Sequence, residues 1–142
     1  MSLAALIHDI GKISIPAELL SKPTKLTEEE FALIKSHSEI GHEILNSFDF
    51  GAPIAKIVLQ HHENVDGTGY PQGITGEDIL HEAKIIRVAD TIEAMASHRP
   101  YRSGLGIDAA LQEINAKKGM FYDPIVVNAC TSLFKERKFE FA

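Results

Sequence analysis

Apolar residues recur at every third or fourth position along most of this 142-residue chain, which is the spacing of a helix face. A clear case is Ile54, Ile57, Val58 and His61, at positions i, i+3, i+4 and i+7. No segment alternates apolar and polar residues for long enough to predict a strand. The pattern predicts an all-α fold. Because the chain contains no internal repeat, low-complexity tract or linker, it also predicts a single domain over residues 1–142.

Composition narrows the class of protein. Hydrophobic residues make up 44% of the chain and charged residues 24%, which are ordinary values for a globular protein. The single cysteine, Cys130, rules out an intramolecular disulfide. No apolar run reaches the roughly 18 residues of a membrane span, and a net charge of -6 argues against bulk nucleic-acid binding. The sequence therefore predicts a soluble cytoplasmic protein that binds neither a membrane nor bulk nucleic acid.

Start and stop signals divide the chain into about five main helices plus loops. Thr27 and Glu30 have the spacing of a capping box, which opens a helix. Asp123 and Pro124 have the chemistry of an N-cap followed by a first helical residue. The expected helices cover residues 27–51, 53–62, 77–97, 107–118 and 124–134. The expected loops cover residues 64–76 and 98–106, and residues 1–10 are expected to form the tail of a helix.

Polar residues also stand on faces that the helical pattern makes apolar. These residues are His8, Asp9, His37, His61, His62 and Asp90. A lone inward histidine is most often a hydrogen-bonded core residue, because burying an unpaired imidazole or carboxylate costs free energy. A group of such residues favours another explanation. Neutral imidazoles and carboxylates bind iron, manganese, zinc or nickel, and facing helices commonly supply metal ligands. The sequence predicts a metal centre between helices.

Two motifs carry a resemblance to a known family. The first, similar to the HD motif of the HD phosphohydrolase superfamily, is His8-Asp9-Ile10-Gly11-Lys12. The second, similar to the HHExxDGxGYP signature of the HD-GYP subfamily, is His61-His62-Glu63 followed by Asp66-Gly67-Thr68-Gly69-Tyr70-Pro71. The segment that resembles the loop after the family's last metal-binding Asp is His98-Arg99-Pro100-Tyr101-Arg102. The resemblance implies an HD-domain helical bundle that hydrolyses cyclic di-GMP with bound metal ions.

The resemblance also implies roles for individual residues. The implied metal ligands are His8, Asp9, His37, His61, His62 and Asp90. Asp9 would bridge two metals, and Asp9 and Lys12 would be the catalytic residues, with Lys12 beside the scissile phosphate. Lys12, Tyr70, Arg99 and Arg102 would bind the substrate. The family uses two or three divalent ions, of which Fe or Mn is the first choice and Zn or Ni an alternative. A metal-bridging hydroxide would attack phosphorus in line and yield linear pGpG, with GMP as a further product.

Some of these residues have a second interpretation. Asp66, Gly67 and Gly69 are typical turn residues and are expected to have a structural role. In the family, the same loop, including Tyr70 and Pro71, is linked to contacts with GGDEF-type cyclase domains. The alternative for Lys12, Arg99 and Arg102 is that they are surface charges in contact with solvent.

The start of the sequence departs from the family pattern. In the family, a preceding helix supplies at least one further metal-binding histidine, whereas the residues before His8 include no His, Asp or Glu. We therefore expect a partial HD-GYP domain, N-terminally truncated by a helix or two and short of one metal ligand. We also expect a homodimer that buries the uncovered apolar surface.

The departure leaves functions of different classes open. One is a metal-dependent cyclic di-GMP phosphodiesterase whose activity is impaired by the missing ligand. The alternative is a non-catalytic module that binds nucleotide or metal and docks a GGDEF-type cyclase or another signalling partner. A third is an HD enzyme that acts on a different phosphorylated substrate.

Overall fold

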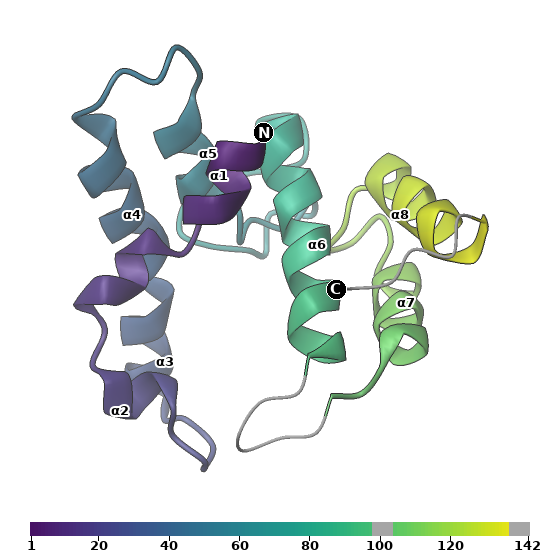
Figure 1. Ribbon diagram of the computed structural model, residues 1–142, viewed down its shortest axis with the longest axis horizontal. Helices are drawn as coiled ribbons and strands as arrows, with labels where there is room; N and C mark the ends of the chain where they lie inside the picture. The colour runs from purple at the N-terminus through teal and green to yellow at the C-terminus, as the bar shows by residue number, and fades with distance from the viewer. Residues whose placement is uncertain (98–103, 137–142) are drawn as a thin grey trace.

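A central helix organises the molecule. The computed structural model describes residues 1–97 and 104–136. Its helices are α1 (Ser2–Ile7), the 3-10 helix η1 (Ile10–Ser14), α2 (Ala17–Leu20), α3 (Glu28–Lys35), α4 (His37–Asn46), α5 (Ile54–Gln60), α6 (His81–Ala96), α7 (Ile107–Ala116) and α8 (Pro124–Glu136). Figure 1 shows α6 in the middle, with α1 to α5 on one side and α7 and α8 on the other. In the described residues β pairing is limited to isolated bridges, which confirms the all-α prediction.

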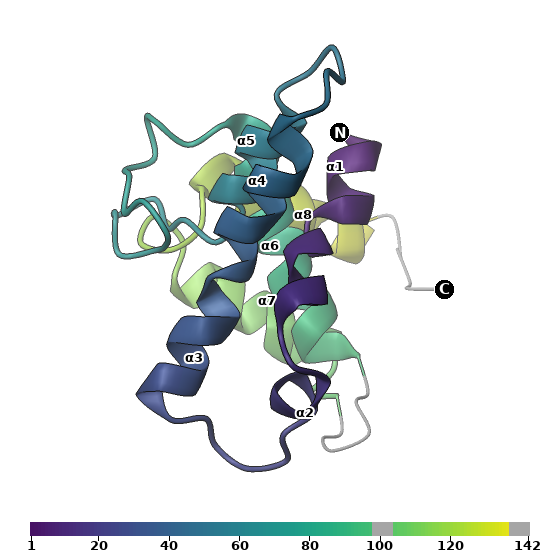
Figure 2. The same ribbon diagram turned by 90° about the vertical axis from the view of Figure 1, so that its left-hand side faces the viewer.

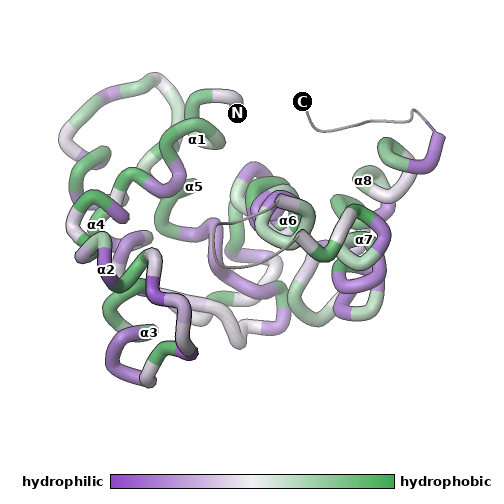
Figure 3. Tube along the Cα trace, turned by 60° about the horizontal axis from the view of Figure 1, so that its bottom comes forward, coloured by the Kyte–Doolittle hydropathy of each residue, from purple (hydrophilic) through white to green (hydrophobic). Residues whose placement is uncertain are grey.

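Two apolar clusters hold these helices together, and α6 contributes to both. Ala83 and Ile86 in its first half pack with buried residues of α1, α4 and α5. Val88 and Ile92, further along the helix, pack with α7 and α8. Figure 3, which colours the chain by hydropathy, shows α6 nearly end-on between the two groups of helices. Among the described helices, none is both long enough and apolar enough to cross a bilayer.

The single helix expected over residues 27–51 is in fact two helices. The predicted capping box of Thr27 and Glu30 is present and opens α3. The helix ends at Lys35, because the side chains that follow bind the free carbonyls of its last turn. Ser36 Oγ donates to the Leu33 carbonyl at 2.6 Å, and His37 Nδ1 lies 2.6 Å from the Ile34 carbonyl. Figure 2 shows α4 continuing from α3 along the same side of the molecule.

Two other helix starts illustrate what sequence signals do and do not capture. The last helix begins at Pro124 as predicted, and Asp123 Oδ1 caps it by accepting from the backbone N–H groups of Ile125 and Val126. The helix expected from about residue 77 starts later, at His81. Residues 76–78 form a turn instead, and the Leu80 N–H donates to Gln60 Oε1 at 2.8 Å. This cap comes from α5, so no local pattern could reveal it.

A close backbone contact joins η1 to α4. A methyl group on Gly11 would lie 1.9 Å from the His37 carbonyl oxygen and 2.7 Å from the Gly41 nitrogen. Both glycines are buried, and the absence of a side chain at Gly11 lets the two backbones touch. Asp9 lies two residues before Gly11, so the contact brings the HD motif against the start of α4.

Candidate metal centre

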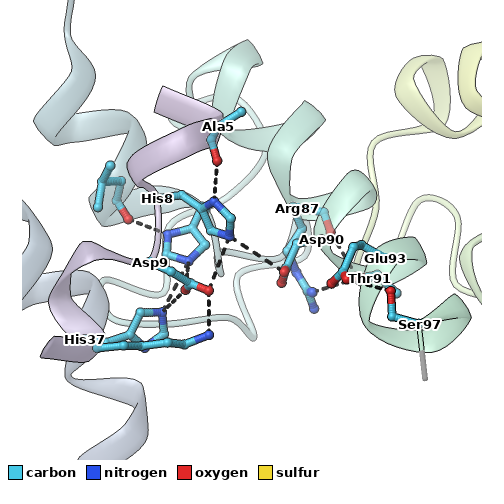
Figure 4. A network of polar contacts seen from close by, with 12 residues as sticks. Ala5, His8, Asp9, His37, Arg87, Asp90, Thr91, Glu93 and Ser97 are labelled. Atoms are coloured by element: carbon cyan, nitrogen blue, oxygen red, sulfur yellow. Dashed lines mark hydrogen bonds and ion pairs between the residues drawn. The ribbon is translucent and has the colours of Figure 1, made fainter. Parts of the chain in front are cut away.

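The polar residues singled out in the sequence meet where several helix ends converge. His8 follows α1, His61 follows α5, and both are the C-cap residues of those helices. His37 opens α4 directly after the end of α3. Asp90 lies on α6, and Figure 4 shows it together with His8, Asp9 and His37. The structure thus brings together side chains that are more than 80 positions apart in the sequence, as the span from His8 to Asp90 shows.

The same local hydrogen bond orients three of the imidazoles. Nδ1 of His8, His37 and His61 lies 2.7, 2.6 and 2.5 Å from the carbonyl oxygen of the residue three positions earlier. A carbonyl only accepts, so Nδ1 carries the proton in each ring and Nε2 presents its lone pair. This is how proteins fix the tautomer and direction of a metal-binding histidine. The free carbonyls at helix ends supply the acceptors.

The two carboxylate oxygens of Asp9 face different neighbours. Oδ1 lies 3.4 Å from His37 Nε2 and 3.9 Å from His61 Nε2. Oδ2 lies 3.5 Å from His8 Nε2 and 2.6 Å from Lys12 Nζ. The arrangement therefore has Asp9 between two sets of donors, which is the position required of a bridging ligand.

The first set, here called the four-donor group, consists of Asp9, His37, His61 and His62. One ligand atom from each lies within 4.8 Å of the others. His37 Nε2 and His61 Nε2 are 3.3 Å apart. Two lone pairs facing each other at this distance repel unless a cation or proton lies between them. The donor set therefore fits a divalent metal ion, which imidazole and carboxylate ligands accommodate.

The second set, here called the three-donor group, consists of His8, Asp9 and Asp90. His8 Nε2 lies 3.7 Å from Asp90 Oδ1. This nitrogen is buried and makes no hydrogen bond in the described part of the chain, so its lone pair is available to a metal ion. The three-donor group has fewer protein ligands than the four-donor group, which among the described residues is the set whose ligand atoms all lie within 4.8 Å of one another.

Burial sets the charge of the imidazoles. It lowers the pKa of His37 and of His62, and it lowers the pKa of His61 to about 4. These three rings are neutral at pH 7, which is the form that binds metal. The Asp90 carboxylate instead raises the pKa of His8. Burial alone would raise the pKa of Asp90, but the interactions with His8, His61 and Lys12 together outweigh it and the pKa is lowered.

The signature loop, residues 63–76, is held by contacts that the sequence did not reveal. Arg87 of α6 donates to Asn64 Oδ1 through Nε and Nη2, at 3.3 and 3.1 Å. Asn64 in turn donates to Thr68 Oγ1, whose hydroxyl donates to Asp66 Oδ1. Glu63, only 2% exposed, accepts from the backbone N–H of Gln72. No pattern in the sequence distinguished Arg87 from the other charged residues of α6, such as Glu82 and Lys84.

The turn residues of the loop have positions that agree with a structural role. Gly67 has a φ of +82°, a backbone conformation that favours glycine. A methyl group on Gly69 would lie 2.3 Å from the Asn64 nitrogen. Tyr70 stacks on His62 with ring centroids 4.9 Å apart and planes 21° apart, and the half-buried Pro71 follows it. The loop thus brings Tyr70 to the edge of the four-donor group. Arg99 and Arg102 lie outside the described residues.

The pattern of the whole sequence agrees with this geometry. Residues 1–126 match the model of the family described as "HD domain". The chain belongs to the HD domain family. The residues that give this family its name are the adjacent His8, which belongs to the three-donor group, and Asp9, which belongs to both donor groups.

Curated relatives of this HD domain are longer proteins. It is 46% identical over 131 residues to "Cyclic di-GMP phosphodiesterase response regulator RpfG" of Xanthomonas campestris, covering 91% of this chain and 35% of that protein. It is 44% identical over 140 residues to "Cyclic di-GMP phosphodiesterase" of Thermotoga maritima, covering 96% of this chain and 38% of that protein. It is 38% identical over 121 residues to "3'3'-cGAMP-specific phosphodiesterase 3" of Vibrio cholerae, covering 85% and 26%. The chain therefore spans little more than a third of these relatives at most.

Solved structures share the fold. The HD domain superposes on Bd1817, an HDG"Y"P protein from Bdellovibrio bacteriovorus, with a TM-score of 0.70 and 23% identity, covering 89% of this chain and 40% of that one. It superposes on the cyclic GMP-AMP specific phosphodiesterase V-cGAP3 of V. cholerae with a TM-score of 0.70 and 18% identity, covering 96% and 38%. These likenesses support the helical architecture described above.

Proposed function

We propose that this HD domain is the catalytic part of a metal-dependent phosphodiesterase that hydrolyses cyclic di-GMP to linear pGpG, with GMP as a further product. The observation that carries the proposal is the position of the Asp9 carboxylate between the four-donor and three-donor groups. The names of the Xanthomonas and Thermotoga relatives support cyclic di-GMP as the substrate. We further propose two or three divalent ions, with Fe or Mn preferred over Zn or Ni.

The residues divide the work of the reaction. Bound divalent ions supply Lewis-acid activation of water for attack on phosphorus. Asp9, the histidines and Asp90 hold these ions. Lys12 lies 2.6 Å from Asp9 Oδ2, where its ammonium group can stabilise charge on a phosphate that displaces this contact. We assign Tyr70, Arg99 and Arg102 to binding the rest of the substrate.

A second function is favoured by one observation. The three-donor group offers fewer protein ligands than the four-donor group. If it holds its ion too weakly for catalysis, the domain acts as a module that binds nucleotide or metal. In that case the signature loop is the surface that we assign to a GGDEF-type cyclase or another signalling partner.

Metal loading followed by a hydrolysis assay distinguishes the two functions. We expect the purified chain, loaded anaerobically with Fe²⁺ or Mn²⁺, to bind at least two metal ions, as measured by elemental analysis. It should convert cyclic di-GMP to pGpG, as measured by chromatography. Chelation of the metal should abolish this conversion until metal is restored. Cyclic di-GMP binding without turnover supports the module. Turnover only of 3'3'-cGAMP or of another phosphorylated substrate contradicts the assigned substrate.

We also propose that the domain forms a homodimer through a groove between α6 and α8. The groove has a volume of about 590 Å³ and is lined by apolar residues such as Ile85, Ala89 and Leu133. Ile125 on its edge is 74% exposed. Ala89 lines the groove, and the next residue along α6 is Asp90 of the three-donor group.

Light scattering after size-exclusion chromatography tests this dimer. We expect a dimer at micromolar concentration and a monomer for Ile125→Asp, because a buried carboxylate without a partner opposes association. Ile13→Asp is the control, since Ile13 is 81% exposed on η1 and does not line the groove. A wild-type monomer contradicts the proposal.

A further inference from the structure

Lys35, which no sequence motif singled out, lies beside the metal centre between two aromatic rings. Its Nζ is 5.1 Å from the ring centroid of Phe31 and 5.6 Å from that of Tyr70. Tyr70 in turn stacks on His62 at 4.9 Å. Two contacts therefore connect the four-donor group to the Lys35 ammonium group: His62 stacks on Tyr70, and Tyr70 contacts Lys35. The backbone gives a second link, because Lys35 precedes His37 by two residues.

The ammonium group of Lys35 has no carboxylate partner in the described part of the chain. The lysines that form ion pairs there are Lys12, Lys22, Lys84 and Lys117. Lys35 is held by the faces of aromatic rings instead, a contact that leaves ammonium hydrogens free to donate. A half-buried cation of this kind can accept an incoming ligand without first breaking an ion pair.

Phe31 adds an exposed aromatic surface next to Lys35. The helix α3 that carries both residues has no buried residue, and the Phe31 side chain is 48% exposed. The helix is held by its capping box and by the Lys22–Glu30 ion pair. Nearly half of the Phe31 side chain is therefore in contact with solvent. A nucleobase can stack on such a ring.

Hydrogen-bonding chemistry selects the base. A lysine ammonium group only donates. Guanine presents two acceptors, O6 and N7, on one edge, whereas adenine presents the N6 amino donor beside N7. Lys35 therefore matches guanine and opposes adenine. This choice matters in a family whose relatives carry both cyclic di-GMP and 3'3'-cGAMP in their names.

We propose that Lys35, with Phe31 and Tyr70, binds a guanine base of the substrate and gives the site its preference for guanine over adenine. The assignment rests on the proposed function, because it takes the ligand to be a nucleotide whose phosphate lies at the metal centre. Lys35 is thus a specificity-determining residue, and Phe31 is a stacking surface that does not discriminate between purines.

Calorimetric binding of GMP and AMP to the metal-loaded chain tests base preference without turnover. We expect wild type to bind GMP more tightly than AMP. The Lys35→Gln variant should lower this ratio of affinities about tenfold, because glutamine pairs with the N6/N7 edge of adenine. Lys35→Arg should restore the preference, since arginine also donates to O6 and N7. Phe31→Ser should weaken the binding of GMP and the binding of AMP to a similar degree.

Control measurements separate an effect on base recognition from an effect on folding or metal binding. Lys56→Gln makes the same chemical change at an exposed position of α5 and should leave the affinity ratio unchanged. Metal content and melting temperature should be equal in Lys35→Gln and wild type. An unchanged GMP-to-AMP ratio in Lys35→Gln, or a wild type that binds neither nucleotide, overturns the proposal. Failure of the proposed function is a different result: the loaded wild type binds GMP selectively but does not hydrolyse cyclic di-GMP.

Discussion

The Asp9→Asn variant is expected to lose bound metal and cyclic di-GMP hydrolysis together. Asp9 is the residue whose two oxygens face separate donor groups, Oδ1 toward His37 and Oδ2 toward His8. Asparagine keeps the size of the side chain but removes the charge and one acceptor. Since loss of a group that merely orients a metal ligand costs about 10–100-fold, loss of this ligand should lower activity at least about a hundredfold.

Elemental analysis and the hydrolysis assay should be made on the same samples of Asp9→Asn, with Lys12→Ala as the comparison. Lys12 contacts Asp9 Oδ2 but belongs to neither donor group. Its removal should leave the metal content intact and lower turnover about a hundredfold, the usual effect of losing one group that stabilises developing charge. Full activity of Asp9→Asn would refute the assigned site. Loss of metal from Lys12→Ala would give Lys12 a structural role instead.

The Gly11→Ala variant is expected to lose most of its folding stability. The added methyl group would lie 1.9 Å from the His37 carbonyl oxygen and 2.7 Å from the Gly41 nitrogen. Both neighbours are backbone atoms of α4 and cannot rotate away. Overpacking usually costs about 1–3 kcal/mol, and a clash with backbone should lower the free energy of unfolding by more than about 3 kcal/mol. Urea unfolding of the metal-free protein measures this change.

Gly51→Ala provides a graded control for Gly11→Ala. Gly51 has a φ of +64° and no atom within 4 Å of the added methyl group. Alanine there should cost only the conformational penalty of a left-handed backbone, about 1–2 kcal/mol. If Gly11→Ala were as stable as Gly51→Ala, the close contact between η1 and α4 would be wrong.

Helical periodicity predicted which segments of this chain are helical better than it predicted where each helix begins and ends. The capping signals of Thr27 and Asp123 are local, and the structure confirms both. The break after Lys35 was missed, because it depends on Ser36 and His37 turning their side chains onto the carbonyls of α3. The role of Gly11 in the approach of η1 to α4 was missed as well. Such contacts depend on partners that the local pattern does not contain.

The sequence by itself determined the residue types of the candidate site: imidazoles and carboxylates on apolar helix faces, where burial requires a partner. Only the tertiary structure decided which donors meet, how Asp9 divides its two oxygens, and that Lys35 stands between Phe31 and Tyr70. The physical reason is the range of the interactions. Helical spacing is set by neighbours three or four residues apart, whereas the distance between side chains on different helices is set by how those helices pack.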